Sequence, residues 1–246
     1  MASTNFVRMF YSAFSLLLLA VPNQVLEVCL SPGCMADGAS EALVKLQALA
    51  PSDWTVEEGG CESLCGKGPI VIQNPETKKI LHKRISGDAL LTLLEELEAN
   101  VPDTMVQGYN IIAQADEAVK KKSNEKAVQL YEEGISMALE AAKSYGGSLS
   151  WLAKALRSLA TCQLAIFEKE AALEAIELAL ALDDKDSESL EVKVQVCQAT
   201  KDTKNEYAAL QAYFALPVPD AFPRDVANRR RTLGFRLQTL EREFGN

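Results

Sequence analysis

Two cysteine pairs between residues 29 and 65 constrain this chain more than any other feature. The first reads Cys29-Leu-Ser-Pro-Gly-Cys34, and the second reads Cys61-Glu-Ser-Leu-Cys65 and continues as Gly-Lys-Gly-Pro69. Glycine and proline beside each pair predict loops. Two loops that each offer two thiolates can close around one iron–sulfur cluster, because such clusters favour four cysteine ligands.

Other interpretations of these four cysteines stay open. Structural zinc also uses four cysteines, but its paired ligands are usually separated by two residues, whereas the spacings here are four and three. Two disulfides are possible if the domain reaches an oxidising compartment. A relic without metal, whose loops serve only structure, is the last alternative. The remaining two cysteines, Cys162 and Cys197, lie in helical patterns and are expected to be buried free thiols.

The residues around the cysteine pairs predict a small α/β domain over residues 23–101. Short apolar runs bounded by turn residues indicate strands, and leucines at helical spacing indicate helices. The predicted order is strand 25–28, helix 40–50 with Ser40 as its N-cap, strand 54–56, strand 69–73, turn 74–77, strand 79–83 and a helix from 86 to about 97.

This arrangement resembles the thioredoxin-like 2Fe–2S ferredoxins, a family that includes the ferredoxin subunit of respiratory complex I and plastid proteins built on the same module. The resemblance covers residues 24–100. It rests on the two cysteine pairs, the downstream Gly38, the Gly-Lys-Gly-Pro69 segment, the hairpin and the last leucine-rich helix. It implies one 2Fe–2S cluster, with metal ligands Cys29, Cys34, Cys61 and Cys65. Glycines such as Gly66 and Gly68 would let the backbone approach the sulfurs.

From Asp103 onward, alanine, leucine, glutamate and lysine dominate, and a repeat is visible. Residues 111–118 and 127–134 form one copy, and residues 156–163 and 172–179 form another, 45 positions later. Both copies resemble the tetratricopeptide pattern, in which small residues such as Gly134 permit close helix crossing. The extra residues before Gly146-Gly147 predict a lengthened second helix, and a weaker third pair covers 187–199 and 203–216. The resemblance implies a helical domain over 103–216 with a concave protein-binding surface; alternatively, the repeats only brace the first domain.

The C-terminal part, 217–246, begins with a proline-rich linker and continues as an amphipathic helix over 224–244. Its apolar stripe is Val226, Leu233, Leu237, Leu240 and Phe244, and six arginines against three acidic residues make it basic. The run Arg229–Arg231 is expected to be a solvated helix face or a contact for acidic lipids or an acidic partner.

The first 22 residues form an apolar leader or anchor. Arg8 is the only charge before Glu27, and residues 9–21 are almost entirely apolar. This run is short for a membrane span, which needs about 20 residues. It is therefore predicted to be a cleaved secretory or bipartite organelle leader, or a retained segment that contacts a membrane.

Charge and motifs exclude several function classes. A net charge of −9 and a pI near 4.9 argue against a nucleic-acid binder. The single histidine, His82, and the lack of nucleotide-binding or hydrolase motifs argue against an enzyme and a small-molecule substrate. Together with the resemblance, this predicts a non-catalytic accessory or linker subunit of a membrane-bound bioenergetic complex. The expected host is a plastid photosystem–antenna assembly at the stromal side of the thylakoid, with light-harvesting or photosystem subunits as partners. A mitochondrial complex is the alternative compartment, and a mobile 2Fe–2S electron carrier or redox sensor is the alternative function.

Overall fold

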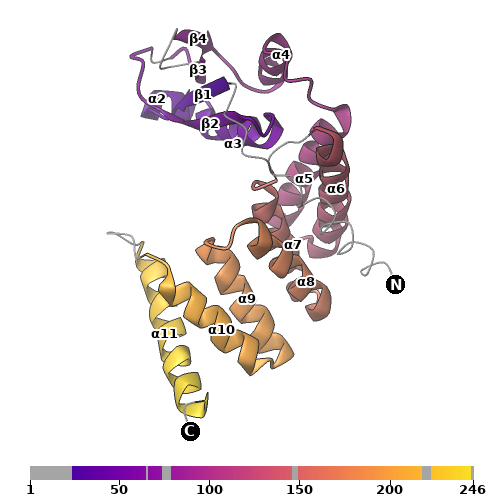
Figure 1. Ribbon diagram of the computed structural model, residues 1–246, viewed down its shortest axis with the longest axis vertical. Helices are drawn as coiled ribbons and strands as arrows, with labels where there is room; N and C mark the ends of the chain where they lie inside the picture. The colour runs from indigo at the N-terminus through magenta and orange to yellow at the C-terminus, as the bar shows by residue number, and fades with distance from the viewer. Residues whose placement is uncertain (1–23, 65, 74–78, 146–148, 218–222, 245–246) are drawn as a thin grey trace. The chain divides into compact units, whose positions relative to one another are not determined.

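The structure is a computed structural model that describes residues 24–64, 66–73, 79–145, 149–217 and 223–244 (Figure 1). A small α/β part comes first and a mostly helical part follows, which confirms the predicted order of fold classes. The first part contains β1 (Gln24–Cys29), α2 (Pro32–Ala36), α3 (Ala39–Leu49), β2 (Trp54–Gly59), β3 (Ile70–Gln73), β4 (Ile80–Lys83) and α4 (Asp88–Glu96).

The strands form one mixed sheet in the order β2-β1-β3-β4. β1 pairs with β2 in parallel, whereas the β1–β3 and β3–β4 pairs are antiparallel. Ile70, Val71 and Ile72 are consecutive and all buried. Since successive side chains of a strand point to opposite faces, both faces of β3 must be covered. The buried leucines of α3 and α4 are Leu43, Leu46, Leu49, Leu90, Leu93 and Leu94.

The start of α3 differs from the sequence prediction. Gly38, at φ 91°, is the N-cap, and its N–H donates to the Met35 carbonyl at 3.1 Å. Its own carbonyl accepts from the N–H of Ala42, also at 3.1 Å. Glycine adopts this left-handed conformation at low cost, so Gly38 connects α2 to α3 without a longer loop. Ser40 therefore lies inside the first turn, and the predicted Ser40 cap is wrong.

The short helix α2 was not predicted. Five residues are too few to show helical spacing, although proline in the first turn favours a helix start. β2 continues beyond the predicted strand as far as Gly59. The predicted turn at 74–77 lies outside the described residues.

The helical part contains α5 (Asp103–Lys120), α6 (Asn124–Tyr145), α7 (Leu152–Ala165), α8 (Lys169–Leu182), α9 (Ser187–Thr200), α10 (Thr203–Ala215) and α11 (Arg224–Phe244). α6 has 22 residues, against 14 in α8 and 13 in α10, which confirms the predicted lengthening. α9 and α10 confirm the weaker third pair, and α11 has the predicted bounds.

One helix-end geometry recurs after α5, α7 and α9. Lys122, Phe167 and Lys201 adopt the left-handed conformation, with φ of 59°, 68° and 61°. The N–H of each of these residues donates to the carbonyl of the residue three positions earlier. The N–H of the next residue donates to the carbonyl of the residue five positions earlier. The latter bond is that of a Schellman motif, which closes a helix. The three positions are 45 and 34 residues apart. The pairs α5–α6, α7–α8 and α9–α10 therefore repeat the same turn.

The chain divides into two compact units, each of which is described by itself. The first runs to Ala113 and includes Glu133–Trp151, and the second contains Gln114–Glu132 and Leu152–Asn246. In the first unit, the Tyr145 hydroxyl donates to the Leu49 carbonyl at 2.9 Å and so joins α6 to the end of α3. In the second, α7 to α11 follow one another as neighbouring helices (Figure 1).

Candidate functional site

The cysteine pairs follow the carboxyl ends of two adjacent parallel strands. In the register of β1 and β2, Cys29 is the partner of Gly59, which precedes Cys61 by two residues. Because parallel strands end at the same edge of a sheet, the loops after β1 and β2 both leave from that edge. The carboxyl edge of parallel strands is also where α/β sheets commonly bind ligands.

Cys29 and Cys34 lie together in the interior. Each side chain is 1% exposed, and the two thiols hydrogen-bond to each other. Burial acts to raise the pKa of Cys29, but hydrogen bonds from Ser31, Cys34 and the backbone N–H of Glu62 together hold that pKa below the ordinary thiol value. Burial and the neighbouring Cys29 raise the pKa of Cys34. Cys29 is therefore the member of this pair that more readily holds a thiolate.

Gly68 places bare backbone against Cys34. A Cβ atom at Gly68 would lie 2.9 Å from the Cys34 Sγ and 3.0 Å from the Cys34 Cα, so no side chain fits there. The close approach predicted for Gly68 is thus present. Gly66 is different, because its Cβ would meet open space and its φ is 78°. Glycine is therefore needed at position 66 for the left-handed backbone of the turn, and not for a close approach of the backbone to a sulfur.

The second cysteine pair is described only in part. Cys61 is exposed, and Cys65 lies outside the described residues. The hydrogen bond from the Glu62 N–H to Cys29 places the start of this loop beside the first pair. Within the ranges that the structure describes, no three His, Cys, Asp or Glu side chains are close enough to hold a metal ion.

The residues of this edge fit a thiolate-bound iron centre in their chemistry. Two adjacent sulfurs are buried, a backbone N–H points at one of them, and glycine backbone covers the other. Iron–sulfur centres are held by such thiolates, and N–H donors near the sulfur tune them. Ser31 was not singled out from the sequence, although its position between the two cysteines was a usable signal.

Cys162 and Cys197 are buried free thiols, as predicted, with exposed fractions of 3% and 1%. Burial raises the pKa of Cys162, and the nearby Asp116 adds to the shift. Burial raises the pKa of Cys197 to about 11. Both therefore stay protonated at neutral pH and are poor metal ligands.

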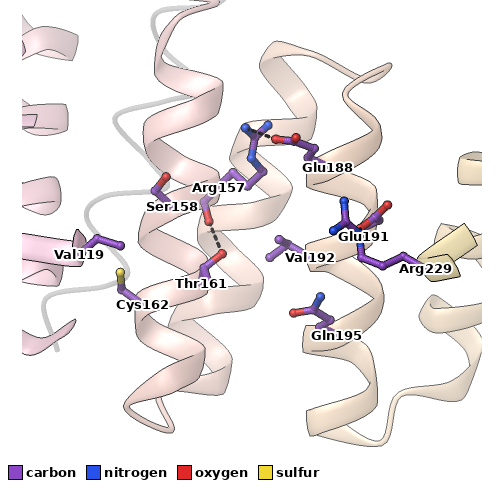
Figure 2. Close-up of a pocket in the computed structure, with 10 residues that line it drawn as sticks. All are labelled: Val119, Arg157, Ser158, Thr161, Cys162, Glu188, Glu191, Val192, Gln195 and Arg229. Carbon is purple, nitrogen blue, oxygen red and sulfur yellow. Dashed lines mark hydrogen bonds and ion pairs between the residues drawn. The ribbon is translucent and has the colours of Figure 1, made fainter. Parts of the chain in front are cut away.

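The second unit carries a groove of about 250 Å³. Its lining comes from the first helix of each pair, α5, α7 and α9, with one residue from α11 (Figure 2). The lining residues are Val119, Arg157, Ser158, Thr161, Cys162, Glu188, Glu191, Val192, Gln195 and Arg229. Sequence reasoning predicted a concave binding surface on the helical part, and these residues form a groove there.

The charges of the groove are paired. Arg157 forms ion pairs with Asp186 and, at 2.6 Å, with Glu188, so it joins α7 to the start of α9 (Figure 2). Arg229 of α11 lies 3.2 Å from a carboxylate oxygen of Glu191. The balanced charges leave a lining of valine, hydroxyl and amide groups between them. Such a lining suits a polypeptide segment better than a strongly charged small molecule.

Of the three consecutive arginines, Arg229 and Arg231 are exposed, as the solvated-face prediction has it, while Arg230 is half-buried; Arg229 and Arg230 also contact neighbouring helices. Arg229 pairs with Glu191 and Asp225, and the guanidinium of Arg230 lies 5.0 Å from the ring centroid of Tyr213 and 4.8 Å from that of Phe214. Both contacts fix α11 to α9 and α10. Spacing within α11 alone could not indicate them, because their partners are distant in the sequence.

No protein-family model matches this chain, and no curated protein matches it. No helix in the described ranges has the length and apolar character to cross a membrane. The apolar run 9–21, for which membrane contact was predicted, lies outside those ranges.

Proposed function

We propose that this protein is a non-catalytic linker subunit of a membrane-bound bioenergetic complex, with a 2Fe–2S centre at the edge of its sheet and a partner-binding helical array. The proposed ligands are Cys29, Cys34, Cys61 and Cys65. We further infer that residues 23–101 form a thioredoxin-like ferredoxin module and that residues 103–216 form a tetratricopeptide-like array. When bound, the cluster would supply a one-electron couple.

The observation that carries the cofactor proposal is the shared strand edge. β1 and β2 end side by side at Cys29 and Gly59, two buried thiols lie at that edge, and the backbone N–H of Glu62 reaches one of them. The chain's own contribution is to exclude water from the first pair and to orient donors toward sulfur. The neighbouring Gly68 keeps the space against Cys34 free of side-chain atoms.

Anaerobic purification of the full chain tests the cofactor. We expect visible absorption with about two iron and two sulfide ions per chain, and a one-electron paramagnetic signal after reduction. Serine at each of the four proposed ligand positions should lower the iron content. Cys162→Ser and Cys197→Ser are matched controls that should retain it. Stoichiometric zinc with no sulfide, or iron retained in all four ligand variants, would reject the cluster.

The linker role rests on the groove of the helical part and on the absence, in the sequence, of a recognisable catalytic constellation. The resemblance to plastid proteins directs the proposal to a photosystem–antenna assembly on the stromal side, with a mitochondrial complex as the alternative. A linker should co-migrate with a large complex after detergent solubilisation and resist a salt wash. It should also do so when its cysteines are replaced, because the groove is formed by other residues.

A mobile electron carrier or redox sensor is the second candidate, and the exposure of Cys61 favours it. Electrons must reach a redox centre through a short path, and an exposed ligand loop would provide one. A carrier should leave the membrane fraction in moderate salt. Release under those conditions, together with a reversible couple, would select this function over the linker.

A further inference from the structure

The third helix pair breaks its repeat at a buried position. Ala127, Ala172 and Glu206 are equivalent, because each donates its backbone N–H to the carbonyl of the residue that immediately precedes α6, α8 or α10. Both alanines are fully buried, and Glu206 is also only 1% exposed. A carboxylate thus occupies a place where the other pairs have a methyl group. A buried carboxylate is costly unless it is paired and hydrogen-bonded.

The partners of Glu206 come largely from outside the repeat. One oxygen accepts from the Arg236 Nε at 2.7 Å and from the Gln198 amide at 2.8 Å. The other oxygen accepts from the Arg236 NH2 group at 2.6 Å. This two-bond arginine–carboxylate contact is directional as well as strong. Because Arg236 belongs to α11, Glu206 binds α10 to this helix.

A second departure in the same pair has the same partner. Gly134 and Ala179 correspond to Tyr213, which is 2% exposed. The Tyr213 hydroxyl donates to Glu191 at 3.0 Å, and Arg230 lies over the Tyr213 ring. Arg229 in turn pairs with Glu191. The face of α9 and α10 that carries Glu191, Glu206 and Tyr213 therefore meets α11 through three arginines.

Apolar contacts accompany these polar ones, because Leu240 of α11 is buried in one cluster with Val194, Ala209 and Leu210. Within Arg224–Phe244, every residue of which the structure describes, Leu240 is the one that is buried. Leu233 and Leu237 pack against this cluster while partly buried, and the centroid of the Phe244 ring, although Phe244 is 49% exposed, lies 5.4 Å from that of the Tyr207 ring. Polar contacts of this kind set which partner fits, and their partly exposed members weaken with salt.

We propose that this face of α9 and α10, defined by Glu191, Glu206, Leu210 and Tyr213, is a binding site for an arginine-bearing amphipathic helix. α11 fills it within the same chain, and a partner helix with the same spacing of arginines and leucines would compete for it. The partner class follows from the contacts: arginines at positions i, i+1 and i+7 for the carboxylates and the tyrosine, with leucines on the same side. This goes beyond the proposed function and involves no cysteine.

A labelled peptide of residues 223–244 tests the site in the full-length protein. The full chain with Arg229, Arg230 and Arg236 replaced by alanine should have its own α11 loosened, and we expect it to bind the peptide. The unaltered chain should not, because its site is filled. A peptide with glutamine at the three arginine positions should fail to bind. Adding Glu206→Gln to the alanine variant should weaken peptide binding about tenfold or more, since a buried charged hydrogen bond is lost.

Amide hydrogen exchange of the unaltered chain is a second test, which does not depend on the folding of the alanine variant. We expect the amides of α11 to exchange faster than those of α9 and α10, and the difference to grow with salt. Exchange of the three helices as one cooperative unit at every salt concentration would overturn the proposal. So would a folded alanine variant that ignores the peptide, or binding that is indifferent to Glu206→Gln.

Discussion

Gly108 of α5 and Gly134 of α6 approach each other so closely that a side chain on either would collide with the backbone of the other. A Cβ atom on Gly108 would lie 2.8 Å from the Gly134 carbonyl oxygen, and a Cβ atom on Gly134 would lie 2.8 Å from the Gly108 carbonyl oxygen. Two helices can cross at this distance only where both positions lack side chains. The crossing fixes the two helices in the first unit.

We therefore expect Gly108→Ala and Gly134→Ala each to destabilise the protein. Replacing glycine by alanine in a helix interior normally stabilises by about 0.5–1 kcal/mol, so the sign of the effect is diagnostic. The clash should reverse it and cost about 1–3 kcal/mol, the usual range for overpacking. Urea unfolding followed by circular dichroism measures the change.

Gly234→Ala in α11 is the matched control, because the nearest atom to its Cβ would be 3.5 Å away, at the Phe214 ring. It should be neutral or mildly stabilising. Equal behaviour of Gly108→Ala and Gly234→Ala would mean that the close crossing is absent in solution.

Gly68→Ala should disturb the cysteine site specifically. The added methyl group would lie 2.9 Å from the Cys34 Sγ and 3.0 Å from the Cys34 Cα, so the sulfur must move. If the four cysteines bind iron, we expect the iron content of anaerobically purified protein to fall while the helix content is retained. Gly60→Ala, whose Cβ meets nothing within 4 Å, should leave the iron content unchanged. Normal iron loading of Gly68→Ala would show that Cys34 is not a ligand.

The two glycines of the α5–α6 crossing, Gly108 and Gly134, differ in how well the sequence predicted their role. Gly134 was predicted as a crossing position because small residues recur within the repeat. Gly108 was not, because it precedes residue 111, where the recognised pattern begins, although the equivalent positions hold the small residues Ala153 and Ser187. Hydrophobic spacing predicted the bounds of α11, since a long amphipathic helix carries its own signal. It could not predict that Glu206 bonds to Arg236, which is 30 positions away, because only the packing of three helices brings them together.

The sequence predicted the candidate site only in part, because only part of the site has a local signal. Cysteine spacing and adjacent glycines are local signals, so Cys29, Cys34 and Gly68 could be named in advance. The hydrogen bond from the Glu62 backbone and the capping role of Gly38 depend on backbone geometry that a one-dimensional pattern does not contain. Partner identity depends on surfaces of other molecules and has no local signal at all.

Acid should weaken the protein through Glu206. The hydrogen bonds from Arg236 lower the pKa of this carboxyl, and they outweigh the opposing effect of burial. A carboxyl whose pKa is lower in the folded state stabilises that state above its unfolded pKa of about 4.3. This contribution should be lost as the pH falls below that value and through the folded pKa. Unfolding free energy measured between neutral and acid pH would show the loss.

Glu206→Gln removes the titrating group, so the unfolding free energy should fall less steeply as the pH is lowered. This acid-side fall in stability is the acid limb of the pH profile. At neutral pH the substitution should also destabilise by about 1–3 kcal/mol, the range for losing hydrogen bonds to a charged group, because the Arg236 side chain that is left behind is 35% exposed and can be solvated. Asp225→Asn is a suitable control, because the Asp225 carboxylate in its pair with Arg229 is exposed, and such pairs contribute about 0–1 kcal/mol. An acid limb that persists unchanged in Glu206→Gln would assign it to other carboxylates.

Phe167→Gly should stabilise the protein even though it removes a large apolar side chain. Phe167 has φ 68° and is 82% exposed, so it is strained and has little packing to lose. The left-handed conformation costs a residue other than glycine about 1–2 kcal/mol, and glycine avoids this cost. Glycine, however, loses more backbone entropy on folding, which offsets about 0.5–1 kcal/mol of the gain. We expect a net gain of about 0.5 kcal/mol in unfolding free energy. Lys122→Gly and Lys201→Gly, at the equivalent helix ends, should give gains of the same size. A clear loss confined to Phe167→Gly would mean that the phenylalanine side chain packs against something in solution, and thermal unfolding at several protein concentrations would show whether that is a second copy of the chain.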